Sequence, residues 1–204
     1  MKRLALLLCL LSLPSAAVTT RASCAVGTSL TYGYSFESVP YPARLETLSG
    51  TPVVNLGIGF DRIASIHTRW QLYCKPFPYR RLVLEGGTND LDLDGTTGAA
   101  LWLTVKSFIE EAQANGQQVV LVLIPPRGGS SGWTAGEETE RLAFNSAARD
   151  YQATHPTLIL IDSDGVLGDG AVPPALQTAY DYGDHLHLKA AGMQALAAAI
   201  AATF

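Results

Sequence analysis

A serine, a histidine and an aspartate have the types and surroundings that nucleophilic chemistry requires. Ser29 lies between two glycines in the segment GTSLTYG, residues 27–33. Asp184 and His187 are three residues apart in the segment DHLH, close to the C-terminus. A serine becomes a nucleophile when a histidine takes its proton and a carboxylate orients that histidine. Without these partners Ser29 is an ordinary turn residue, so its interpretation depends on the elements that position it.

Two further segments contain groups that stabilise a negatively charged oxygen. Asn89, in the segment GGTND at 86–90, has a side-chain amide that donates hydrogen bonds. The segment NLGIGFD, at 55–61, offers backbone N–H groups in a glycine-rich turn. Donors of these two kinds form the oxyanion holes of acyl-transfer enzymes. The alternative is that Asn89 only caps the helix that follows.

Two patterns resemble metal sites, and neither is complete. The segment DLDLDG, at 90–95, has the acidic spacing of half an EF-hand calcium loop, but Leu101 stands where the twelfth position requires Glu. Asp184, His185 and His187 include zinc-binding types, but no further ligand set stands out in the other loops. We therefore expect no metal and no other cofactor.

Short apolar runs alternate with helical patterns along the chain. The runs are almost continuously apolar, which is typical of parallel strands covered on both faces. They lie at 22–27, 52–57, 81–87, 118–125 and 157–162, and the first is the weakest. Helical patterns lie at 63–74, 101–115, 134–155 and 189–204, the third opening with a capping box of Thr134 and Glu137. The alternation predicts an α/β fold, a three-layer α/β/α sandwich with a central parallel sheet of about five strands.

This fold predicts where the candidate residues lie. In an open parallel sheet the ligand site forms at the carboxyl ends of the strands. The segments with Ser29, Gly59 and Asn89 each follow a predicted strand, and Asp184 and His187 come just before the last helix. We therefore expect them at one edge. His67 and His155, inside and at the end of predicted helices, are expected to be structural.

The four segments together, in this order, resemble the SGNH (GDSL) hydrolase family. GTSLTYG resembles its nucleophile block, VVNLGIGFD its glycine block, LEGGTND its Gly-x-Asn-Asp block and DHLH its Asp-x-x-His block. The resemblance extends over nearly all of the chain after the N-terminal apolar run. It implies the flavodoxin-like fold of that family, a catalytic triad of Ser29, Asp184 and His187, and an oxyanion hole formed by Ser29, Phe60 and Asn89.

The chain departs from the family pattern at two positions near the expected site. Thr28 stands where the family usually has Asp, a residue thought to order the loop. Phe60 stands where the family usually has glycine, which adopts backbone conformations that Phe resists. We expect the neighbouring Gly59 to absorb the strain. If both departures mark a loss of activity, the chain is a catalytically impaired binding protein on the same fold; a metal-dependent hydrolase is the remaining alternative.

The resemblance implies a small-molecule ester as substrate, such as a short-chain ester, an acetylated carbohydrate, a lysophospholipid or a thioester. The segment PPRGGSSGWT, at 125–134, follows a predicted strand and is rich in Gly and Ser. It is either a solvated connector or a wall of the binding site, in which case Gly59, Arg127 and Trp133 contact the substrate. No large lid or long apolar insertion is visible, which favours a small-acyl esterase over a long-chain lipase.

The N-terminus has the pattern of a secretion signal. A basic start is followed by an apolar run at 4–13 and by small residues, so we expect cleavage after Ala17 and one catalytic domain at 18–204. The expected location is secreted or periplasmic, without stable membrane insertion after cleavage; the alternative is an uncleaved anchor. Outside the signal remain Cys24 and Cys74, which either pair or stay reduced. The formal net charge of −4, without basic runs, gives no sign of nucleic-acid binding, and no oligomeric state is indicated.

Overall fold

A five-stranded parallel sheet forms the centre of the molecule. The computed structural model describes residues 22–33 and 39–204. The strands are ordered β2-β1-β3-β4-β5, and every neighbouring pair is parallel. Their bounds are β1 Ser23–Gly27, β2 Val53–Gly57, β3 Arg81–Leu84, β4 Gln118–Val122 and β5 Ile159–Ile161. All five apolar runs thus contain a strand, including the weak first run, which forms the strand between β2 and β3.

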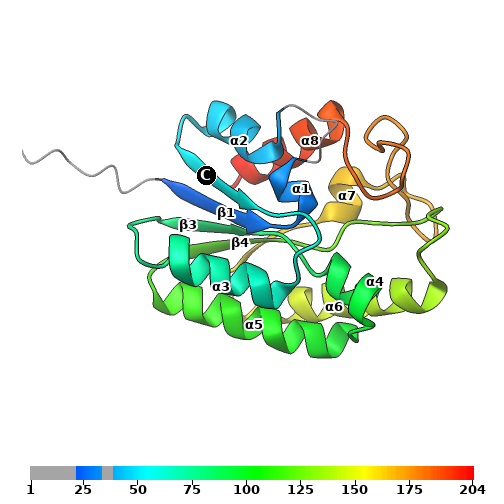
Figure 1. Cartoon of the computed structure of the whole chain (residues 1–204), viewed down its shortest axis with the longest axis horizontal. Coiled ribbons are helices and arrows are strands. Elements are labelled where there is room, and N and C mark those ends of the chain that lie inside the picture. The colour runs from blue at the N-terminus through cyan, green and yellow to red at the C-terminus, as the bar shows by residue number, and fades with distance from the viewer. Residues whose placement is uncertain (1–21, 34–38) are drawn as a thin grey trace, which may run out of the picture.

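Alternate residues of the inner strands supply two separate cores. Cys24 and Val26 of β1 face one core and Ala25 faces the other, because successive side chains in a strand point to opposite faces. The first core includes apolar residues of α3 (Ile63–Tyr73), α5 (Gly98–Ala114) and α6 (Ala135–Thr154). The second includes residues of α2 (Tyr41–Ser49) and α8 (Ala190–Ala201). Figure 1 shows these two helical layers on opposite faces of the sheet, so the three-layer sandwich is confirmed.

The long helices lie where their apolar patterns predicted them. Ile63, Ile66 and Trp70 form the buried stripe of α3, and α5 ends just before Asn115. At the start of α6 the Thr134 hydroxyl accepts from Glu137 N, and the Glu137 carboxylate accepts from Thr134 N, so the capping box is confirmed. The short helices α1 (Ser29–Tyr32), α4 (Thr88–Asp94) and α7 (Ser163–Leu167) had no periodic pattern to predict them.

The two cysteines left open by the sequence are joined by a disulfide. Cys24 lies in β1, Cys74 follows α3, and both are fully buried in the first core. The bond therefore fixes the end of α3 to the middle of the sheet. The expected signal peptide, residues 1–17, lies outside the described residues. None of the helices in residues 22–33 and 39–204 has the length and apolarity needed to cross a bilayer.

We predict that the double variant Cys24→Ala/Cys74→Ala loses about 4 kcal/mol of unfolding free energy, because a cross-link between residues 50 positions apart restricts the unfolded chain. Urea denaturation of the oxidised wild type and the variant measures this loss. Reduced wild type is the control, since it keeps both sulfur atoms in the core and lacks only the bond. Equal stability of oxidised and reduced wild type would contradict the prediction.

Candidate active site

Ser29 begins α1, directly after β1 and Thr28. Its side chain is almost buried, and its Oγ lies 2.9 Å from Nε2 of His187. These residues are 158 positions apart, and the fold brings them together because His187 lies just before α8. With the ring proton on Nδ1, Nε2 of His187 accepts a hydrogen bond from the Ser29 hydroxyl.

Asp184 orients the ring of His187 from the same short loop. Nδ1 of His187 lies 2.6 Å from Oδ2 of Asp184. The other carboxylate oxygen, Oδ1, accepts backbone N–H groups from Leu186 at 3.0 Å and from His187 at 2.8 Å. Burial raises the pKa of the Asp184 carboxyl, but the hydrogen bonds from His187 and Leu186 outweigh burial and lower this pKa below its ordinary value. The lowered pKa favours the ionised form of the Asp184 carboxyl beside the imidazole.

A second aspartate holds the loop itself. Asp181 accepts backbone N–H groups from Gly183 at 2.8 Å and from His185 at 3.0 Å, and it lies 2.9 Å from Nδ1 of His185. An isolated bridge between Asp181 and Leu188 closes the loop. His185 thus pairs with Asp181, while His187 faces Ser29. The structural roles expected for the other histidines fit their contacts: His67 bonds Glu111, and His155 ends α6.

The loop between β2 and α3 lies against Ser29. A Cβ atom added at Gly59 would lie 3.9 Å from the Cβ of Ser29. Phe60 has a φ of +65°, in the left-handed region that favours glycine, and its side chain is 71% exposed. The expectation that Gly59 absorbs the strain is wrong, because the positive φ falls on Phe60 itself. Phe60 thus adopts a backbone conformation that glycine usually makes. For a residue with a side chain, this conformation costs about 1–2 kcal/mol of free energy.

Polar contacts fix this loop to the sheet and to α4. Arg69 of α3 donates to the carbonyls of Leu56 at 2.7 Å and Gly27 at 3.2 Å, and it forms an ion pair with Asp61. The side-chain amide of Asn89, in the first turn of α4, donates to the Asp61 carbonyl at 3.0 Å. One amide proton thus holds the loop, and an Asn amide has a second proton to donate.

Asp90, the residue after Asn89, holds the start of α3. Both carboxylate oxygens lie 3.2 Å from the backbone nitrogen of Ile63. Burial raises the pKa of the Asp90 carboxyl to about 6, although the hydrogen bond from Ile63 acts in the opposite direction. The segment that resembles half an EF-hand is thus mostly helix α4, with Asp90 bonded to the backbone.

Arg127 and Trp133 form part of the wall of a cavity of about 380 Å³. The Arg127 guanidinium is 4.7 Å from the centre of the Trp133 ring and 2.6 Å from a carboxylate oxygen of Asp92, on the helix that contains Asn89. On the other side, a Cβ atom at Gly129 would lie 3.4 Å from the ring of His185. The segment 125–134 therefore lies between α4 and the loop of Asp184 and His187.

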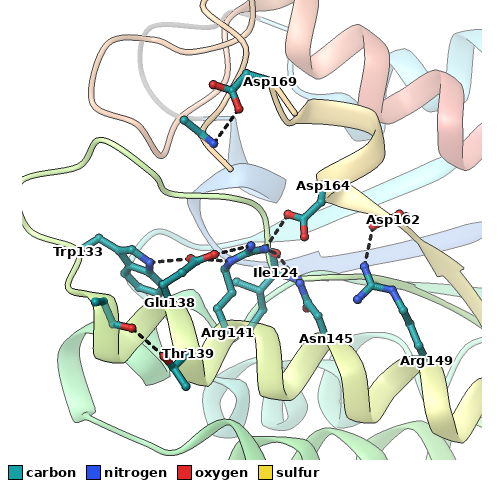
Figure 2. A network of polar contacts seen from close by, with 12 residues as sticks. Ile124, Trp133, Glu138, Thr139, Arg141, Asn145, Arg149, Asp162, Asp164 and Asp169 are labelled. Carbon is teal, nitrogen blue, oxygen red and sulfur yellow. Dashed lines mark hydrogen bonds and ion pairs between the residues drawn. The ribbon is translucent and has the colours of Figure 1, made fainter. Parts of the chain in front are cut away.

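A buried polar network fixes the end of this segment. Trp133 Nε1 donates to Glu138 at 3.0 Å, and Glu138 pairs with the fully buried Arg141. Arg141 also donates to the carbonyl of Ile124 at 2.8 Å and to Asp164 at 2.7 Å. Figure 2 shows these contacts running from Trp133 through Glu138 and Arg141 to Asp164. Trp133 is thus held by α6 and is no part of a freely solvated connector.

Glu85 is a residue of this edge that the sequence reasoning missed. It follows β3 directly and is almost completely buried, and its carboxylate accepts hydrogen bonds from Thr28 beside Ser29. The sequence contains one signal that could have indicated it, a charged residue between the apolar run RLVL and two glycines. Arg69 and Asp61 were also missed, because neither shows its partner in the sequence.

The described part of the chain gives no group of three His, Cys, Asp or Glu side chains that would hold a metal ion. Ser29, His187 and Asp184 instead form a continuous hydrogen-bonded chain from hydroxyl to carboxylate. Such a chain can transfer a proton from the serine to the imidazole while keeping the resulting charge beside an ionised carboxylate.

Comparison with known proteins gives the class of the molecule. Residues 25–195 match the model of the GDSL-like Lipase/Acylhydrolase family. The match extends over most of the chain, which therefore belongs to this family and is a hydrolase of the GDSL type. The chain matches no curated protein.

Solved structures agree with this fold. A G-D-S-L family protein from Desulfitobacterium hafniense is similar with a TM-score of 0.76 and 18% identity, covering 90% of this chain and 99% of that chain. A GDSL-like lipase from Bacteroides thetaiotaomicron has a TM-score of 0.72 and 17% identity, covering 90% and 87%. A lipase/acylhydrolase from Enterococcus faecalis has a TM-score of 0.67 and 21% identity, covering 90% and 94%. At these identities the likeness shows the fold.

We predict that Asp90→Asn becomes more stable relative to wild type as the pH rises from 4 to 7. The folded protein raises the pKa of Asp90 from 3.8 to about 6, so it favours the neutral carboxyl. The preference for the neutral carboxyl therefore stabilises the folded wild type below the pKa of Asp90 in the unfolded chain. This stabilisation is lost as the pH rises through 6. The difference in unfolding free energy should change by roughly 1–2 kcal/mol, and then level off.

Urea denaturation at several pH values measures this difference. Asp94→Asn is the matched control, because the hydrogen bond from Arg62 lowers the pKa of Asp94. For Asp94→Asn the opposite is expected: the wild type should become more stable relative to the variant as the pH rises. A pH-independent difference between Asp90→Asn and wild type would contradict the prediction.

Proposed function

We propose that the protein is an exported serine esterase that cleaves small carboxylic esters through an acyl-enzyme. The observation that carries this proposal is the geometry at Ser29, whose Oγ lies 2.9 Å from His187, with the other ring nitrogen 2.6 Å from Asp184. Membership of the GDSL-like Lipase/Acylhydrolase family supports the same reaction class.

In the proposed reaction, Nε2 of His187 takes the proton of the Ser29 hydroxyl while Oγ attacks the ester carbonyl carbon. The imidazolium stays beside the Asp184 carboxylate, and it then gives the proton to the leaving alcohol oxygen as the carbon–oxygen bond breaks. A water molecule, deprotonated by His187, attacks the acyl-enzyme in the second half. The acid leaves, and the proton returns to Ser29. No cofactor takes part in these steps.

The carbonyl oxygen becomes negatively charged in both halves of this reaction. We assign its stabilisation to the backbone N–H groups of Ser29 and Phe60 and to the second amide proton of Asn89. Two observations support this assignment: a Cβ atom added at Gly59 would lie 3.9 Å from that of Ser29, and Asn89 donates a hydrogen bond to the Asp61 carbonyl. One such donor contributes about 3 kcal/mol in comparable enzymes.

The cavity beside Trp133 favours an apolar acyl group over a sugar. Its lining includes the side chains of Trp133, Leu142, Pro173 and Pro174. The charged groups of the wall, Arg127 and Glu138, already pair with Asp92 and Arg141. The cavity wall includes Gly129, where an added Cβ atom would lie 3.4 Å from the ring of His185, two residues before His187.

The proposed export rests on the secretion pattern of residues 1–17 and on the disulfide. Cysteine pairs persist in secreted and periplasmic proteins and are rare in reducing compartments. The bond between Cys24 and Cys74 therefore supports a secreted or periplasmic location for the domain at 18–204.

We predict that Ser29→Ala lowers the hydrolysis of p-nitrophenyl acetate by at least about a thousandfold, because the nucleophile is lost. A fluorophosphonate probe should label Ser29 in the wild type and leave the variant unlabelled. Ser163→Ala is the control, since Ser163 is a buried serine of α7 and should leave the rate unchanged.

Undiminished hydrolysis by Ser29→Ala would overturn the mechanism. A wild type that neither reacts with the probe nor turns over esters would instead be the impaired binding protein. Loss of activity in EDTA would favour the metal-dependent alternative.

We predict that Trp133→Ala raises KM about tenfold for p-nitrophenyl esters of medium-length acyl chains and leaves kcat within about twofold. The reason is that the ring contributes contact area to substrate and transition state alike, and tenfold corresponds to about 1.4 kcal/mol. KM for the acetate ester should hardly change, because a methyl group does not fill the cavity. Phe77→Ala, an exposed aromatic beyond α3, is the control. Equal effects on all chain lengths would contradict the proposed acyl cavity.

A further inference from the structure

A buried carboxyl group lies directly beneath the turn that contains Ser29. Glu85 is 1% exposed, and its Oε2 accepts the backbone N–H of Thr28 at 2.8 Å. The Thr28 hydroxyl lies 2.9 Å from both carboxylate oxygens, and the Thr31 hydroxyl lies 2.9 Å from Oε2. Glu85 thus binds the residue before Ser29 and the residue two positions after it.

The residues around the Glu85 carboxyl leave space for it and add hydrogen bonds next to it. A Cβ atom at Gly27 would lie 2.6 Å from Oε2 of Glu85, so the residue at 27 must lack a side chain for the group to reach the turn. The backbone N–H of Glu85 donates to the Val26 carbonyl at 3.1 Å, and Tyr41 Oη lies 3.2 Å from the Thr31 hydroxyl. The contact thus forms where β1 and β3 end side by side.

The burial of Glu85 carries an energetic cost that an apolar residue would avoid. Burial raises the pKa of its carboxyl above the ordinary value, although the hydrogen bonds from Thr28 and Thr31 act in the opposite direction. These partners are neutral N–H and hydroxyl groups, so the group is satisfied without an ion pair. Burying a carboxyl in this way costs free energy relative to a hydrophobic side chain.

We propose that Glu85, directly after β3, is a positioning residue that supplies the acidic group that the family pattern places at position 28. The proposal rests on the proposed function. The peptide unit between Thr28 and Ser29 contains the Ser29 N–H, which we assign to the oxyanion hole. Glu85 holds the N–H of the preceding peptide unit and the hydroxyl of Thr28. Through Thr28 it restricts the direction of the Thr28–Ser29 peptide unit and the position of the Ser29 side chain. The acidic group of this chain thus lies just after β3, instead of in the loop before Ser29.

The proposal predicts that restoring the family residue is harmful. In Thr28→Asp two carboxyl groups would lie within about 3 Å of each other, and carboxylates at that separation cannot both ionise freely. We expect kcat to fall about a hundredfold. Glu85→Gln alone, which turns one acceptor into a donor, should lower kcat about tenfold. The double variant Thr28→Asp/Glu85→Gln should recover to within about tenfold of wild type, because the Gln amide donates to the new carboxylate.

The measurements are kcat and KM for p-nitrophenyl acetate, the rate of fluorophosphonate labelling and Tm for all four proteins. KM should stay within about twofold, because Glu85 does not contact the substrate, while kcat and labelling rate fall together. Thr28→Asn, which has the shape of Asp without the charge, should lose less kcat than Thr28→Asp. Thr104→Asp on the exposed face of α5 controls for the added acid and should leave kcat unchanged.

Full activity of Thr28→Asp with Glu85 intact would overturn the proposal, as would a double variant no better than Thr28→Asp. Thr28→Asp that folds only when Glu85→Gln is also present supports it. Failure of the proposed function is distinguishable, because either Ser29→Ala would then hydrolyse as well as wild type or the wild type itself would hydrolyse no ester. The Tm values of the four proteins would still report the contact between positions 28 and 85.

Discussion

The parallel register of β1 with β2 and β3 is the constraint on which the rest of the structure depends. Gly27 pairs with Gly57, and Val26 pairs with Leu84, so the three strands end level with one another. The loops with Ser29, Gly59 and Asn89 therefore start at one edge. A slip of one residue would move each loop by about 3.3 Å and turn every side chain to the opposite core. The loop of Asp184 and His187 reaches this edge independently of these three strands, from the start of α8.

Three carboxyl groups at this edge differ because of their surroundings. Asp184 accepts several hydrogen bonds on a partly exposed loop, and its pKa is lowered. Asp90 and Glu85 are more deeply buried, and their pKa values are raised. The first suits a permanent negative charge beside an imidazole. The other two accept backbone N–H groups of Ile63 and Thr28, and these hydrogen bonds favour the charged form without outweighing burial.

The sequence predicts those parts of the fold and site that depend on local pattern. Apolar runs predicted the strands, and apolar periodicity predicted the long helices. Both patterns arise because residues on the buried faces of an element must be apolar, and these residues recur at the spacing of that element. The family blocks predicted which residues gather around Ser29. The four-residue helix α1 is too short to show a period. Glu85, Arg69 and the positive φ of Phe60 depend on contacts between distant segments, which a single sequence does not display.

If the cavity beside Trp133 takes the acyl group, as proposed, the network around Arg141 also bears on how the substrate range can change. Ile124 is fixed by Asn145 and Arg141, and Thr134 is fixed by its capping box with Glu137. The chain between these two anchors forms one side of the cavity, and it includes none of the residues that surround Ser29. A Cβ atom at Gly128 would lie 2.6 Å from the Pro174 carbonyl oxygen, whereas one at Gly132 meets nothing within 4 Å. Replacements therefore fit at 132, while both ends of the segment stay in place. Under the proposed function, one wall of the acyl cavity thus belongs to a segment that is separate in the chain from Ser29, Asp184 and His187.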